Sequence, residues 1–166
     1  MYQRILLAYD GSAEGRTALR EGALLARCCN AQVFLLSVVG GSPGVQLAEG
    51  AFAGAIDHEH QQLKVVFEEG VERLKQMGFS PVAKLVIGDP LVEIRSFCKE
   101  VRADLVVVGH RRRTFVERWW AGRSDAYLVD QIDCSLLIAR NWIDDETFRT
   151  EMAAAAGHPR SVDRDG

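Results

Sequence analysis

Three consecutive arginines, Arg111, Arg112 and Arg113, follow an apolar run that ends at Gly109. Guanidinium groups bind phosphate in a bidentate manner, and a glycine at the end of a strand lets backbone N–H groups approach an anion closely. The cluster therefore predicts a phosphate-binding loop. A solvated or purely structural role for the arginines is the alternative. Asp10 ends another apolar run, and its carboxylate is either a ligand-binding group or a turn residue that accepts from nearby backbone N–H groups.

Strands and helices alternate along the chain and must position these residues. Short apolar runs predict strands at residues 5–9, 33–39, 82–87, 104–108 and 136–139. Apolar residues at helical spacing predict helices at 13–29, 63–77, 90–101 and 124–131, with Ser12 and Asp89 as N-caps. Residues 40–54 are rich in glycine and small side chains, which predicts a mobile loop.

Such alternation is typical of an α/β fold, an open doubly wound five-stranded parallel sheet with helices on both faces. With strand order 3-2-1-4-5, the first and fourth strands are neighbours, and a ligand crevice opens between their carboxyl ends. Asp10 and Gly109 stand at those two ends. The sequence thus places the carboxylate and the arginine cluster at the edge of one crevice.

Bulk properties exclude several classes of protein. The 166 residues are 48% hydrophobic, with a formal charge of −3, and no apolar run approaches the ~20 residues of a membrane helix. We expect a cytoplasmic protein, since the start of the chain lacks a signal-peptide pattern, and we expect no membrane or nucleic-acid partner. Cys98 and Cys134 are isolated in the sequence and Cys28 adjoins Cys29, which favours free thiols.

The segments ILLAYDGS, VFLLSVV, VIGDP, ADLVVVGHR and CSLLIAR occur in this order and resemble the universal stress protein A family. The resemblance covers about residues 2–140. It implies a Rossmann-like domain of the adenine nucleotide alpha hydrolase-like type at 1–140, followed by a tail at 141–166. It also implies a stress-response binding and signalling module that is not an enzyme. The resemblance further implies a homodimer through the last strand, Leu136 to Ala139, where an edge strand would have unpaired N–H and C=O groups. Covering of that edge by the protein's own tail is the alternative.

Family members that bind ATP carry the signature G-x2-G-x9-G followed by Ser or Thr. This sequence has Gly109 and Gly122, but Arg112 replaces the second glycine and Arg123 replaces the hydroxyl residue, with Ser124 one position late. Three alternatives stay open. The arginines form a side-chain site for ATP or AMP, the protein belongs to a branch without nucleotide, or it is a weak ATPase.

If a nucleotide binds, the resemblance implies adenine near the first two strands and phosphates in the arginine loop. The residues implied are Tyr9, Asp10, Val38, Val108, Gly109, Arg111, Arg112, Gly122, Arg123 and Ser124.

Other motifs predict less chemistry. His58 and His60 point in different directions on a helix, so no metal site is expected, and no serine has a histidine at a catalytic spacing. Asp144 to Glu146 can begin a short helix in the tail, which extends past the end of most family members. That helix docks on its own domain or on an unknown protein partner, and residues from Pro159 onward are expected to be disordered.

Overall fold

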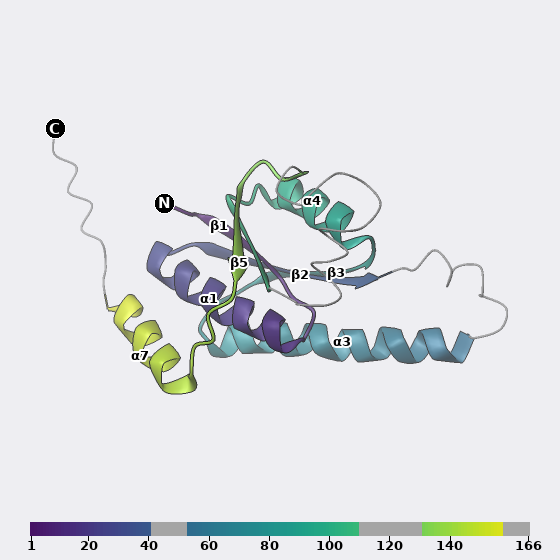
Figure 1. Ribbon diagram of the computed structural model, residues 1–166, viewed down its shortest axis with the longest axis horizontal. Helices are drawn as coiled ribbons and strands as arrows, with labels where there is room; N and C mark the ends of the chain where they lie inside the picture. The colour runs from purple at the N-terminus through teal and green to yellow at the C-terminus, as the bar shows by residue number, and fades with distance from the viewer. Residues whose placement is uncertain (41–52, 110–130, 158–166) are drawn as a thin grey trace.

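The computed structural model describes residues 1–40, 53–109 and 131–157, and Figure 1 shows their arrangement. Five strands form one parallel sheet in the order β3-β2-β1-β4-β5. Their bounds are β1 (Arg4–Ala8), β2 (Gln32–Gly40), β3 (Val82–Gly88), β4 (Leu105–Gly109) and β5 (Ser135–Ala139). The predicted fold class and strand order are confirmed.

Helices cover both faces of the sheet. On one face, α1 (Ala13–Cys29) and α3 (Ala53–Gln76) pack on Ile5, Leu7 and Leu35. On the other, α4 (Pro90–Val101) packs on Leu6 and Phe34 (Figure 1). Because side chains alternate across a strand, neighbouring residues of β1 enter different cores. Burial on both faces explains why the strands read as unbroken apolar runs.

The predicted helix starts at Ser12 and Asp89 are confirmed at the level of single hydrogen bonds. The Ser12 hydroxyl accepts from the Gly15 N–H at 2.9 Å. Asp89 Oδ1 accepts from the backbone N–H groups of Leu91 at 2.9 Å and Val92 at 3.2 Å. These bonds satisfy donors that the first turn of a helix leaves without an intrahelical acceptor. They fix where α1 and α4 begin, at the carboxyl edge of the sheet.

The helix predicted at 63–77 is longer than expected. It begins at Ala53, ten residues earlier, and takes up the last two residues of the predicted loop. In Figure 1 its first turns project past the strands, where no sheet face is available to require an apolar stripe. The rest of that loop lies outside the described residues, as does the predicted helix at 124–131 apart from Gln131.

The tail helix docks on its own domain. It forms α7 (Asp145–Ala156), which begins after Asp144 and buries Phe148 to 8% exposure. Arg20 of α1 donates to the Ile143 carbonyl at 2.8 Å, pairs with Asp145, and places its guanidinium 5.3 Å from the centre of the Phe148 ring. The region from Pro159 lies outside the described residues. Of the helices described, none combines the length and apolar character needed to cross a membrane.

Candidate functional site

The carboxyl ends of β1 and β4 lie side by side. The two strands pair directly, with Ile5 opposite Leu105 and Leu7 opposite Val107. The chain leaves β1 toward Asp10 and leaves β4 at Gly109, so the two predicted crevice residues reach the same edge of the sheet. This is the strand reversal point at which open α/β sheets bind ligands.

A pocket occupies this edge and encloses about 460 Å³, including space open to solvent. Its inner part is apolar and combines strand residues with side chains of α4, whereas its rim is formed by the turn into α1. The lining residues are Ala8, Tyr9, Asp10, Ser12, Gly15, Leu36, Val38, Pro90, Ile94, Val108 and Gly109. An apolar slot with a few polar groups at one end is the usual form of a small-molecule site.

Asp10 is the polar centre of that rim. Its Oδ1 accepts from the Ser12 N–H at 3.0 Å and from the Ser12 hydroxyl at 2.6 Å. A Cβ at position 15 would lie 2.4 Å from the same oxygen, so only glycine allows the first turn of α1 to come this close. The half-buried carboxylate is therefore held in one place at the start of the helix. It is suited to accept hydrogen bonds from hydroxyl or amino groups and to repel phosphate.

Gly109 has a structural reason to be glycine. A Cβ there would lie 2.6 Å from the backbone carbonyl carbon and oxygen of Glu14. The end of β4 thus passes directly against the first turn of α1. This close approach brings Gly109 itself to the pocket rim that Asp10 occupies.

Tyr9 contributes mainly to the core on the α1 and α3 side. Its residue is 3% exposed, and a Cβ at Gly70 of α3 would lie 2.6 Å from its ring. Burial raises the pKa of the Tyr9 phenol, and the charge of Glu69 adds to this, although Arg16 acts in the opposite direction.

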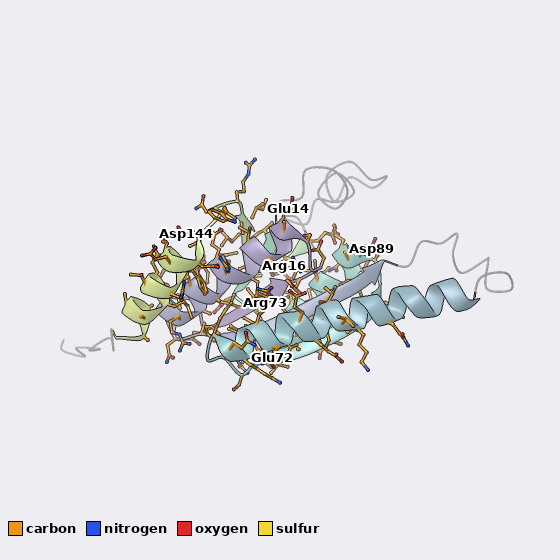
Figure 2. The ribbon with its side chains drawn as sticks, turned by 90° about the horizontal axis from the view of Figure 1, so that it is seen from below. Glu14, Arg16, Glu72, Arg73, Asp89 and Asp144 are labelled. Carbon is orange, nitrogen blue, oxygen red and sulfur yellow. The ribbon has the colours of Figure 1, made fainter. Side chains whose placement is uncertain are left out.

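Glu69 links the two helices on that side. It accepts from Arg16 of α1 at 3.2 Å and from Arg73 of its own helix at 2.8 Å. Figure 2 shows both arginines in the space between α1 and α3. The pKa of the Glu69 carboxyl is lowered, chiefly by the hydrogen bond from Arg16.

Comparison with protein families identifies the chain. The family model described as "Universal stress protein family" matches residues 1–140. The chain belongs to the universal stress protein family. A relative in the family, universal stress protein MJ0531 of Methanocaldococcus jannaschii, is 28% identical over 145 residues, which are 84% of this chain and 83% of that protein.

Solved structures of universal stress proteins share the fold. One in complex with cAMP has a TM-score of 0.62 and 21% identity, covering 84% of this chain and 97% of its own. Another, from Archaeoglobus fulgidus in complex with dAMP, has a TM-score of 0.61 and 20% identity, covering 84% of this chain and 98% of its own. The observed sheet is thus the fold of this family.

Half of the residues implied by the family resemblance meet in the pocket, and half lie outside the described residues. Tyr9, Asp10, Val38, Val108 and Gly109 all line it. The remaining five, which belong to the loop after β4, are not described: Arg111, Arg112, Gly122, Arg123 and Ser124.

Several lining residues escaped the sequence reasoning. Ala8 and Leu36 are register partners on adjacent strands, and the sequence pattern predicts only that they belong to the core. Pro90 and Ile94 enter through the packing of α4, and the Gly-Asp-Pro segment was the one available signal. Within the described residues, no group of three His, Cys, Asp or Glu side chains is placed to hold a metal ion. The side chains of His58 and His60 are not among those described.

Proposed function

We propose that this universal stress protein binds an adenine nucleotide, AMP or ATP, in the pocket between β1 and β4, and acts as a non-catalytic stress-response module. The observation that supports this most strongly is the composition of the pocket. Apolar side chains from β1, β2, β4 and α4 line its interior, while a fixed carboxylate stands at its rim.

Each part of a nucleotide has a counterpart in this arrangement. A purine ring suits the apolar interior formed by Val38, Val108 and Ile94. The ribose hydroxyls can donate hydrogen bonds to the Asp10 carboxylate. Since Asp10 repels phosphate, the phosphates must lie farther out, past Gly109, where the sequence continues with Arg111 and Arg112. The cAMP and dAMP named for the two solved relatives belong to the same ligand class and support the proposal.

The groups described at the rim support the non-catalytic part of the proposal. The Ser12 hydroxyl donates to Asp10 and accepts from Gly15, so it is committed to the turn. None of the described residues lining the pocket is a histidine that could activate it. We therefore expect the bound nucleotide to remain intact.

A second candidate is a nucleotide-free homodimeric interaction module. Arg112 and Arg123 replace two residues of the ATP signature, which favours this candidate. Association would use β5, which lies at the edge of the sheet and has partly buried side chains at Leu136 to Ile138.

Nucleotide recovery separates the two candidates. Freshly purified protein is heated, and the released small molecules are separated by chromatography. We expect AMP, ADP or ATP in proportion to protein, and an increase in melting temperature when AMP or ATP is added to stripped protein. No released nucleotide and no thermal shift would contradict the proposal and favour the nucleotide-free module. Phosphate released from ATP in proportion to protein, and lost in Asp10→Ala, would instead show a weak ATPase.

The double change Arg112→Gly with Arg123→Ser tests how phosphate is held. It restores the family signature at two positions. If arginine side chains are the phosphate ligands, affinity for ATP should fall by about 10-fold because charge-assisted hydrogen bonds are lost. Calorimetry with ATP measures this. A rise in affinity would show that the arginines obstruct a backbone site.

A further inference from the structure

Two cysteines that are far apart in the sequence lie in contact between α4 and the start of β5. Cys98 lies in the last turn of that helix, and Cys134 immediately precedes β5. Their sulfur atoms are 3.4 Å apart, although the residues are 36 positions apart. Both belong to the apolar cluster that α4 forms with the sheet. The other two cysteines, Cys28 and Cys29, lie at the end of α1.

The surroundings of the pair define which reagents can reach it. Cys98 is 5% exposed, whereas Cys134 is half-buried and so more accessible. A hollow of about 590 Å³, including space open to solvent, lies beside Cys98. Two cationic side chains of α4, the cationic side chain of its C-cap Arg102 and one carboxylate line it together with apolar residues: Arg95, Lys99, Arg102, Asp133, Ala103 and Ile132. An anionic small molecule is favoured there over a cationic one.

We propose that Cys98 and Cys134 are a modification site at which an anionic low-molecular-weight disulfide introduces a reversible intramolecular disulfide bond. The Cys134 thiolate attacks one sulfur of the reagent, forming a mixed disulfide and releasing one reagent thiol. The Cys98 thiolate then attacks the Cys134 sulfur and displaces the second reagent thiol. The two cysteines lose two electrons and two protons, and the reagent is reduced to two thiols.

The geometry requires only a small movement. A disulfide bond is about 2.05 Å long, so the two sulfurs must approach each other by roughly 1.4 Å. Cys134 lies in the short connection before β5 rather than inside a strand, so side-chain rotation and a shift of that connection can provide the movement. Reduction by excess thiol reverses the same two steps.

The Cys134 thiol is expected to react slowly at neutral pH. Burial, then the neighbouring Cys98, raise the pKa of the Cys134 thiol to about 12. Charged groups near the pair come from α4 and from the residues just before β4 and β5: Arg95, Lys99, Arg102, Asp104 and Asp133. Since the thiolate is the nucleophile, the reaction rate should increase about tenfold with each unit of increasing pH, as long as the pH stays below that pKa. Such slow exchange distinguishes this pair from a fast redox catalyst.

The bond would join α4 to the edge strand of the sheet. It closes a loop of the chain between residues 98 and 134, which contains all of β4. A covalent loop of this size restricts the unfolded chain and should raise the melting temperature by about 10 °C. Amide exchange of Leu136 to Ile138 should slow as well, because β4 is the one neighbour of β5 among the strands that the structure describes.

The test uses the full chain with Cys28→Ala and Cys29→Ala, so that only the proposed pair remains. Oxidised glutathione is added to native protein at pH 8.5, and free thiols, melting temperature and peptide masses are measured. We expect both thiols to disappear, a peptide that links Cys98 to Cys134, and the increase in melting temperature. Dithiothreitol should reverse all three. Because the same variant is compared before and after oxidation, its intrinsic stability does not affect the result.

The matched control adds Cys134→Ser, a change at a half-buried position that nearly preserves side-chain size. This variant should gain neither the cross-link nor the thermal shift. The proposal is overturned if the native pair keeps its free thiols, stops at a mixed disulfide with glutathione, or cross-links only in denaturant. Equal rates at pH 7.5 and pH 9.5 would also contradict it, because the buried thiol predicts about a 100-fold difference.

Discussion

Asp10 and Asp89 each follow a strand of the sheet and each accept hydrogen bonds at the start of a helix. Asp89 is exposed, and its Oδ1 caps α4 directly through Leu91 and Val92. Asp10 is half-buried and accepts from Ser12, and the Ser12 hydroxyl makes the capping bond to Gly15. Of the residues described, Asp10 lines the pocket and Asp89 does not, although Pro90 beside it does. Figure 2 shows Asp89 at the start of α4, with Asp144, a third capping aspartate, on the other side of the view.

The contrast teaches how one residue type at one topological position serves two purposes. In α4 the aspartate performs the capping itself, so its carboxylate is committed to the helix. In α1 the serine performs the capping, and the aspartate is placed at the pocket rim by the serine. Each aspartate can therefore serve as the control for a substitution of the other.

Asp10→Ala should have the largest effect. Removal of the carboxylate deletes the acceptor for the ribose hydroxyls, and hydrogen bonds to charged groups are worth about 1.5–3 kcal/mol, so affinity for AMP should fall about 10- to 100-fold. Titration calorimetry on nucleotide-stripped protein measures this. Asp10→Asn, which keeps an oxygen for the turn, should lose less affinity. Unchanged affinity in both variants would show that Asp10 serves only the turn.

Asp89→Ala should affect stability and leave binding intact. Loss of the N-cap costs about 1 kcal/mol, which corresponds to a decrease in melting temperature of about 2–4 °C. Thermal unfolding monitored by circular dichroism measures this decrease. Asp89→Asn should keep most of the wild-type melting temperature, because asparagine also caps helices. A large decrease in AMP affinity in Asp89→Ala would contradict the claim that Asp10 serves the pocket and Asp89 serves only the helix.

Glu21, an acid in the middle of α1, gives the smallest effect and a pH dependence. Burial raises the pKa of its carboxyl, against a weaker opposing hydrogen bond from the Asn141 backbone. The charged form is therefore disfavoured in the fold, so its ionisation costs stability as pH rises above its ordinary pKa. Glu21→Gln should raise the melting temperature slightly at pH 7, and the difference should vanish in acid.

Glu69→Gln should change the melting temperature in the opposite direction. Its pKa is lowered by Arg16 and Arg73, so the charged form stabilises the fold above its ordinary pKa, and that stability is lost as pH falls. The substitution should lower the melting temperature at pH 7 and have less effect at low pH. Equal pH profiles for the two variants would contradict the assigned environments.

The sequence contains most of the fold because several local signals agree. Apolar runs, Ser12 and Asp89 as caps, and glycines at strand ends together predicted the strands and helices. The strand order and the crevice followed from the doubly wound arrangement that this alternation favours. The early start of α3 was missed because helical periodicity records contact with a core, and its first turns project beyond the sheet. Local sequence carries no comparable signal for such a segment.

The site was less predictable because its walls come from packing. Asp10, Val38 and Val108 follow from strand ends, whereas Pro90 and Ile94 depend on how α4 lies over the sheet. The meeting of Cys98 with Cys134 likewise depends on α4 and β5 being brought together, and no spacing in the sequence records it. The sequence also left open where α7 docks. The structure shows that it packs on α1 through Arg20 and Phe148.

One measurement tests the central claim most directly: parallel calorimetric titrations of the stripped wild-type protein, Asp10→Ala and Asp89→Ala with AMP. The account predicts one saturable site per chain in wild type, the same affinity in Asp89→Ala, and affinity reduced about 10- to 100-fold in Asp10→Ala. No binding of AMP or ATP to wild type, or equal affinities in all three proteins, would contradict it.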